Sequence, residues 1–280
     1  MRVVCISKND NCFKSNKFAQ ADLGYKKLLQ KGLKDSYGLS VKIEDLKPVA
    51  GPNELWDIIT RLKPWHYEIG NTFRANFHIH TNASDGSFTA EEFLDACKDW
   101  ADSVFKKKNL KTDIPPFSAS ITDHDSVDNV KKVLALISQN PDKYKNFKFV
   151  TGCEFLFNGY KKPYSAFEAV GLGFNPFDEN IEPMTQFRVS KNNVSDVEKV
   201  IKAGGILSWA HPVVTPDKIN DDFFNFLKSN GINGVEGNYQ YEHWDSEYVD
   251  PINIEVNELI KKHNMFSTGG TDSHRKSIFK

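Results

Sequence analysis

The segment FHIHTNASDG, residues 77–86, has the pattern of a buried strand that ends in a polar loop. Residues two apart in a strand point to the same side, so His78 and His80 are expected to project together. Asp85, just before the turn-forming Gly86, can return a carboxylate to the same place. Imidazole and carboxylate ligands together favour Zn, Mn or Fe. A single H-x-H pair is a modest signal, because two histidines on a strand more often lie on the surface or in the packing.

Short apolar runs that end in polar residues recur through the chain. After residues 77–79, these runs are 117–121, 147–152, 167–174, 205–210, 232–235 and 265–270. Helical patterns separate most of them, over 91–105, 127–138, 194–203, 221–230 and 252–264, and Thr89 with Glu92 forms a predicted capping box for the first. Strands that alternate with helices imply a parallel sheet. The ligand-type residues follow the strands, and TIM-type barrels place their chemistry at that edge.

The histidines are concentrated at these strand ends. Five of the eight lie there, namely His78, His80, His124, His211 and His274, whereas His66, His243 and His263 do not. Asp85, Glu154 and Asp272 occupy equivalent positions. Carboxylates that converge without a cation would repel one another, so the pattern predicts a site for two or three divalent metal ions.

Residues 1–73 differ from the rest of the chain. VVCIS is a strand candidate, and helical patterns cover 18–38 and 52–62. No ligand-type residues cluster here, so we expect an N-terminal α/β extension followed by a barrel domain over residues 74–280.

Bulk composition excludes several classes of protein. The formal net charge of -1 gives no overall basic field for nucleic acid. Four cysteines lie far apart, as in a reduced, cytoplasmic protein. No run is apolar enough to cross a membrane, and the N-terminus lacks the features of a signal peptide. We therefore expect a cytoplasmic protein.

Six motifs in order resemble the PHP (polymerase and histidinol phosphatase) superfamily of metal-dependent phosphoesterases. They are FHIHTNASDG, ITDHD, GCEF, WAHP, GVEGNY and GGTDSH, and they span about residues 74–276. TNASDGSFTAEEFL and ITDHDSV look closest to the small stand-alone bacterial phosphoesterases that act on nucleotides and RNA 5′ ends. The resemblance implies a distorted (β/α)7 TIM-like barrel with a trinuclear site.

The resemblance also implies a set of metal ligands. The first metal would be held by His78, His80, Glu154 and Asp272. The second would be held by Asp85, His124 and His274. The third would share Glu154 and take His211 and one further histidine. This chain departs from the pattern at that last position, where Glu168 stands, so either Glu168 is a ligand or the protein works with two metals.

Other side chains have expected roles around the metals. His211 and Asp272 are the catalytic candidates among the ligands, and Arg188 and Arg275 are candidates for gripping phosphate. Glu236 is expected to orient a histidine rather than bind metal. For the remaining residues we expect roles other than metal binding. Asp123 either orients a ligand or is structural, Asp125 caps the next helix, and Cys153 is a buried thiol. The aromatic residues Tyr239, Tyr241 and Trp244 either belong to a packed or solvated loop or stack on a base.

The predicted function is hydrolysis of a phosphomonoester by a metal-activated hydroxide, with Mn, Zn or Fe as the metal. The substrate would be a small phosphorylated molecule, such as a nucleotide, a bisphosphate nucleotide or a short RNA end. Two alternatives are a histidinol-phosphate-type phosphatase and a non-catalytic PHP module that binds or assembles. An amidohydrolase, which also opens with H-x-H, is disfavoured because no lysine follows a strand in a ligand position.

Overall fold

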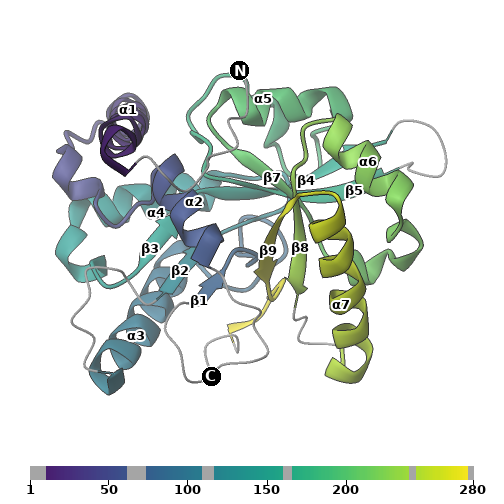
Figure 1. Ribbon diagram of the computed structural model, residues 1–280. Coiled ribbons are helices and arrows are strands. Elements are labelled where there is room, and N and C mark those ends of the chain that lie inside the picture. Colours follow the sequence, from purple (N-terminus) through teal and green to yellow (C-terminus); the bar gives the residue numbers. More distant parts are fainter. Residues whose placement is uncertain (1–10, 62–73, 109–116, 160–165, 240–243, 277–280) are drawn as a thin grey trace.

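The computed structural model describes residues 11–61, 74–108, 117–159, 166–239 and 244–276, which form a mixed α/β fold (Figure 1). This confirms the α/β class that the sequence predicts, whereas the described strands form two sheets rather than one closed barrel. The helices are α1 (Asn11–Tyr37), α2 (Pro52–Arg61), α3 (Ala90–Lys108), α4 (Asp128–Gln139), α5 (Val197–Lys202), α6 (Asp221–Ser229) and α7 (Ser246–Lys262). Short 3-10 turns are η1 (Ile43–Leu46), η2 (Pro141–Tyr144), η3 (Glu182–Met184), η4 (Val194–Asp196), η5 (Pro212–Val214) and η6 (Pro216–Lys218). Among the helices described, none is long and apolar enough to cross a membrane.

The helices overlap the segments where their sequence patterns predict them, but two begin earlier than predicted: α1 at Asn11 rather than at residue 18, and α7. The capping box of α3 is present, since the Thr89 N–H donates to Glu92 and the Glu92 N–H donates to the Thr89 hydroxyl. The pattern predicted the last helix from Ile252, but α7 already begins at Ser246 and passes through Pro251. Proline lacks an N–H and disfavours a helix interior, which is why the sequence pattern suggested a later start.

The strands form two sheets. They are β1 (Arg74–Asn76), β2 (Phe117–Ser120), β3 (Lys148–Val150), β4 (Gly152–Asn158), β5 (Ala166–Leu172), β6 (Asn192–Asn193), β7 (Ile206–Trp209), β8 (Gly234–Tyr239) and β9 (Phe266–Gly270). One sheet has the order β1-β2-β3 and is parallel. The other has the order β6-β4-β5-β7-β8-β9.

The expectation of a wholly parallel sheet is wrong for β5. This strand pairs antiparallel with both β4 and β7. Only residues 159–165 join β4 to β5, which is too short for the crossover that a parallel pair needs. The reversal brings the beginning of β5, rather than its end, to the edge where the other strands finish.

The two sheets meet at that edge. On one side, the Phe77 N–H donates to the Gly269 carbonyl at 3.1 Å, and Ile79 forms a bridge with Ser273. On the other side, the Asp125 N–H donates to the Glu154 carbonyl at 2.8 Å. The segments that follow β1 and β9 are therefore held close together, and the segment that follows β2 is held against β4.

The N-terminal helices cover the opposite edge. Leu55, Ile58 and Ile59 of α2 share an apolar cluster with residues from inside the sheets, including Leu172 at the end of β5 and Ile206 at the start of β7. Helix α1 adds Leu29 and Leu33 to the main core. Both helices thus contribute side chains to apolar clusters that also contain residues of the strands. VVCIS lies outside the described residues.

Candidate metal centre

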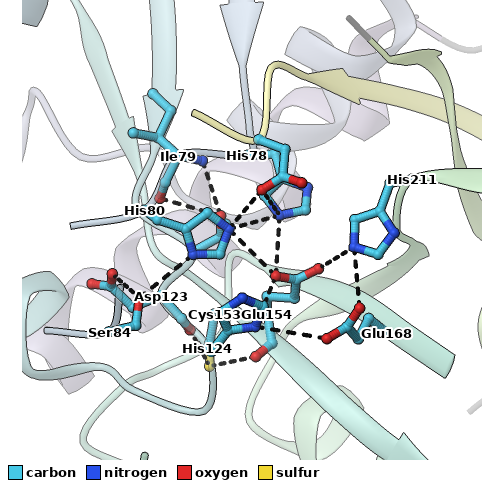
Figure 2. Close-up of polar contacts among 12 residues, drawn as sticks. His78, Ile79, His80, Ser84, Asp123, His124, Cys153, Glu154, Glu168 and His211 are labelled. Carbon is cyan, nitrogen blue, oxygen red and sulfur yellow. Dashed lines mark hydrogen bonds and ion pairs between the residues drawn. The ribbon is translucent and has the colours of Figure 1, made fainter. Parts of the chain in front are cut away.

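The strand predicted at residues 77–79 lies earlier, as β1 (Arg74–Asn76), so His78 and His80 follow it rather than belong to it. Ile79 between them still forms a parallel bridge with Ser273, and the two histidine side chains point to the same side. Both side chains are fully buried, and their Nε2 atoms lie 3.1 Å apart. The Glu154 carboxylate, from β4, lies between this pair and His211 (Figure 2).

Glu154 and Asp272 complete the first predicted ligand group. Oδ1 of Asp272 lies 2.9 Å from Nε2 of His80 and 3.5 Å from Nε2 of His78. Oε2 of Glu154 lies 3.2 Å from Nε2 of His78 and 3.4 Å from Nε2 of His80. The structure therefore brings together all four residues expected around the first metal.

The second predicted group lies beside the first and is partly open to solvent. Oδ1 of Asp85 is 3.3 Å from Nε2 of His274, and Oδ2 is 3.7 Å from Nε2 of His124. The other ring nitrogen of His80, Nδ1, lies 3.6 Å from Asp85. His80 also stacks on His274, with ring centroids 4.3 Å apart. Its position between the two groups was not predicted.

The third group contains Glu168, the residue that stands where the family pattern has histidine. Nε2 of His211 lies 2.8 Å from Oε1 of Glu154 and 3.3 Å from Oε2 of Glu168. Nδ1 of His124 lies 3.8 Å from Oε1 of Glu168. Because β5 is antiparallel, Glu168 near its beginning reaches the edge that the other ligands share. Its carboxylate is thus close enough to act with Glu154 toward one ion.

The protonation of these groups reflects their mutual proximity. Burial raises the pKa of the Glu154 carboxyl, but the neighbouring His78 and His211 outweigh it and hold the pKa well below its usual range. Burial lowers the pKa of the His211 imidazole, but hydrogen bonds to Glu154 and Glu168 outweigh this effect and raise the pKa to about 10. A cation that replaces the His211 proton would find the Glu154 carboxylate already ionised.

The arrangement of donor atoms fits divalent metal ions. Oε2 of Glu154 is buried and finds no hydrogen-bond partner among the described residues. Yet three imidazole nitrogens surround it, because Nδ1 of His124 lies 3.1 Å away in addition to Nε2 of His78 and His80. Lone pairs that converge on a carboxylate oxygen in this way are satisfied by a cation placed between them.

Further residues orient the ligands. Oε1 of Glu236 lies 3.0 Å from Nδ1 of His78, and its Oε2 accepts the backbone N–H of His211 at 2.8 Å. Nδ1–H of His78 can therefore donate to Glu236, which directs the Nε2 lone pair into the centre. The Tyr239 hydroxyl donates to Oδ2 of Asp272 at 2.9 Å. The structure thus gives Glu236 the predicted orienting position. It also makes Tyr239 a partner of Asp272, which the sequence did not suggest.

The two aspartates beside His124 differ. Asp123 is buried and accepts hydrogen bonds from the Thr81 backbone N–H, the Thr81 hydroxyl and the Ser84 hydroxyl, which confirms a structural role. The prediction that Asp125 caps α4 is wrong. Its carboxylate accepts a hydrogen bond from the Asn192 amide at 2.8 Å, and the residue before the helix is Val127. Asp125 has a left-handed backbone, with φ 41°, which turns the chain away before the helix begins.

Backbone strain also marks the site. Among the described residues, the non-glycine residues with positive φ are Asp125, Arg188, His211, Asn264 and Asp272. His211 and Asp272 are ligand candidates, and Asp125 adjoins a third. Such conformations cost of order 1–3 kcal/mol each, and they cluster at functional sites. The fold therefore holds these ligands in positions that an unconstrained chain would avoid.

Several other predicted residues lie outside the cluster. Arg188 and Arg275 are exposed, and neither belongs to a ligand group, so phosphate binding by them stays a prediction. Cys153 is fully buried, as predicted. His263 pairs with Asp221 away from the centre. His66, Tyr241 and His243 lie outside the described residues.

Comparison with known proteins yields similarities at the level of structure only. No family model matches the chain, and no curated protein sequence matches it. A candidate metal-dependent phosphoesterase from Bifidobacterium adolescentis has a TM-score of 0.48 at 14% identity, over 71% of this chain and 87% of that chain. A two-domain protein from Bacteroides vulgatus that contains a predicted PHP-like metal-dependent phosphoesterase has a TM-score of 0.45 at 15% identity, over 73% of this chain and 53% of that chain. Similarity this low does not assign a family to the chain.

Proposed function

We propose that the chain is a metal-dependent phosphoesterase that works with two or three divalent ions. The observation that carries the proposal is the buried Oε2 of Glu154, which has no hydrogen-bond partner in the described part of the chain and faces nitrogens of His78, His80 and His124. One carboxylate oxygen shared among several imidazoles is the arrangement expected of a ligand that bridges metal ions. When bound, such ions supply Lewis acidity that lowers the pKa of water and neutralises phosphate charge.

The exposure of the ligands indicates where substrate enters. His78, His80 and Glu154 are fully buried, whereas the side chains of Asp85 and Glu168 are 45% and 29% exposed. The buried histidines would fix the ions, and the outer carboxylates would leave room for a phosphate. Buried partners such as Glu236 keep the inner imidazoles in one orientation, which holds the reacting groups in place.

For the substrate, we propose a phosphomonoester of a nucleotide, a bisphosphate nucleotide or a short RNA end, as the sequence motifs suggest. We also interpret the two sheets, joined at their shared edge, as the distorted barrel of that resemblance. The alternatives are a histidinol-phosphate-type phosphatase and a non-catalytic module. The ligand set favours catalysis, because every expected position except that of Glu168 is kept, whereas a decayed site would have lost several ligands.

The test is phosphate release from mononucleotides, 3′,5′-bisphosphates, histidinol phosphate and short 5′-phosphorylated RNA, with added Mn, Zn or Mg. His80→Ala removes the imidazole shared by two ligand groups. It should lower turnover more than about a hundredfold, beyond the usual effect of changing an orienting partner. It should also lower the metal content measured by elemental analysis. His263→Gln, at a histidine outside the centre, is the matched control and should leave both unchanged.

Turnover that requires metal and is lost in His80→Ala would support the proposal. The preferred substrate would distinguish a nucleotide or RNA-end phosphoesterase from a histidinol-phosphate-type phosphatase. A folded, metal-loaded protein that hydrolyses none of these esters would instead support the binding module.

A further inference from the structure

Two aromatic side chains lie stacked on each other and exposed at the beginning of α7. The ring centroids of Trp244 and Tyr248 are 4.9 Å apart, and their planes differ by 24°. The two residues are 38% and 44% exposed. Large aromatic side chains are usually buried in a core, where they contribute most to stability, so a stacked pair left in solvent suggests a binding surface.

This pair lies at the same edge of the fold as the metal centre. The beginning of α7 lies beside the end of β8 (Figure 1), where Val249 of α7 packs with Tyr239. One residue, Tyr239, joins the helix to the centre: its carbonyl accepts the Asn253 amide of α7 at 2.9 Å, and its hydroxyl donates to Asp272 at 2.9 Å. The position of α7 is thereby fixed relative to a metal-ligand candidate.

A small apolar cluster connects helix α7, which carries Tyr248, to the turn after His211. Val213 of η5, Tyr239 and Val249 of α7 are buried together in one small cluster. Val214, the next residue of η5, is 48% exposed. The turn that follows a ligand and the helix that carries Tyr248 are therefore packed against each other, and both present apolar side chains to solvent.

Building on the proposed phosphoesterase activity, we propose that Trp244 and Tyr248 form a stacking platform for the planar base of a nucleoside monophosphate whose phosphate is held at the metal centre. A flat, exposed aromatic surface binds any base through its π face, because stacking does not depend on a particular hydrogen-bond pattern. The apolar Val214 suits a planar ring better than a charged group. The platform would thus determine which phosphate esters the centre receives.

The test separates base recognition from hydrolysis. For binding, calorimetry on the metal-loaded full chain compares phosphonate analogues of adenosine 5′-monophosphate and ribose 5-phosphate, in which CH2 replaces the ester oxygen and prevents turnover. For catalysis, kcat/KM is compared for the two natural esters. Trp244→Ala and Tyr248→Ala are the test variants, and Trp244→Phe preserves an aromatic face. Tyr37→Ala is the matched control, because Tyr37 is also 44% exposed but lies at the end of α1.

In the wild type, we expect the adenosine phosphonate to bind more tightly than the ribose phosphonate. Trp244→Ala should reduce that preference about tenfold, which is within the range for loss of one base-stacking side chain. Trp244→Phe should restore most of it, and Tyr37→Ala should not change it. The kcat/KM ratio of the two esters should follow the same order.

A preference that Trp244→Ala and Tyr248→Ala leave unchanged would overturn the platform, as would failure of the adenosine phosphonate to bind. Hydrolysis of both esters in that case would leave the phosphoesterase proposal standing. Conversely, binding that depends on Trp244 without hydrolysis of either ester would support the platform and overturn the proposed activity.

Discussion

The two nitrogens of His78 face different carboxylates, and these two contacts fix the orientation of the ring in the buried part of the centre. Nδ1 faces Glu236, and Nε2 faces Glu154. Burial lowers the pKa of His78, but Glu236 and Glu154 outweigh that effect and raise the pKa well above its usual range. A metal ion must therefore displace a firmly held proton. Glu236 stabilises the His78 ring in both its neutral and its protonated form, and it also accepts the backbone N–H of His211.

We therefore expect Glu236→Gln to weaken metal binding about 10- to 100-fold while the fold is retained. Glutamine keeps the shape of the side chain, but its amide N–H2 would face either the His78 ring or the His211 N–H, which are both donors in the oriented site. The measurement is a competition titration of zinc against a chromophoric chelator. Glu255→Gln, at an exposed glutamate of α7, is the control. Equal affinity in the wild type and Glu236→Gln would contradict the orienting role.

The sequence predicted the ligand candidates better than their partners. Histidines and carboxylates after strands are recognisable because parallel strands end at one edge. Tyr239 was missed because its hydroxyl reaches Asp272 only after β8 and β9 pair. Asp125 was misread because an aspartate before a helix is usually a cap, whereas here Asn192, far along the chain, binds its carboxylate.

At the scale of elements, β5 shows what a sequence pattern does not contain. Its apolar run correctly predicts a strand, but the direction depends on the length of the connection that precedes it. The reversal decides whether Glu168 reaches the centre. The helices were easier to predict, because the apolar period that defines them is local.

Helix α2 was predicted as a helix, but its packing was not. Leu55 is only 2% exposed and meets Gly173, whose φ of 73° turns the chain after β5. We expect Leu55→Ala to lower the free energy of unfolding by about 2–5 kcal/mol, through lost burial and the cavity left behind. Urea denaturation measures this change. Leu23→Ala, at a leucine 41% exposed on α1, should change it by less than about 0.5 kcal/mol. Similar losses of unfolding free energy in the two variants would show that α2 does not cover the edge of the sheets opposite the metal centre.

An ion-pair network holds α2 to its neighbours. Glu54 pairs with Lys26 of α1 at 3.2 Å and with Lys148 of β3 at 2.9 Å. Burial raises the pKa of Glu54, but the two lysines outweigh it and lower the pKa below the ordinary 4.5. Because the folded state favours the ionised carboxylate, this stabilisation is present above about pH 4.5 and is lost as the pH falls through the lower, folded-state pKa.

Accordingly, Glu54→Gln should reduce the free energy of unfolding by about 1–3 kcal/mol at pH 7 and by clearly less at pH 3. Urea denaturation at the two pH values gives the comparison. Glu44→Gln, at an exposed glutamate of η1, controls for the general effect of losing a negative charge. If wild type and Glu54→Gln differ in their free energy of unfolding by the same amount at pH 3 and at pH 7, the ion pairs are not the source of the difference.

In the molecule as a whole, the two edges of the sheets have different roles. At one edge, α2 fills the space with leucine and isoleucine, which supports the fold. At the other edge, buried carboxylates and imidazoles gather in place of apolar side chains, and their desolvation costs stability unless charges of opposite sign are paired. Stability of the full chain should therefore depend on what occupies the centre.

Metal binding should thus raise the midpoint of thermal unfolding, because ions that bind the folded chain shift the equilibrium away from the unfolded one. One ion at about a hundred times its Kd contributes about 2.7 kcal/mol, or about 5 °C for a chain of this size. Calorimetry with Zn or Mn, and with a chelator instead, measures the shift. His80→Ala should lose most of it because His80 lies between two ligand groups, whereas His263→Gln should retain it. If the midpoint is the same with metal and with chelator, the charges of the convergent carboxylates and imidazoles are balanced by one another alone. The proposal of a metal centre would then be wrong.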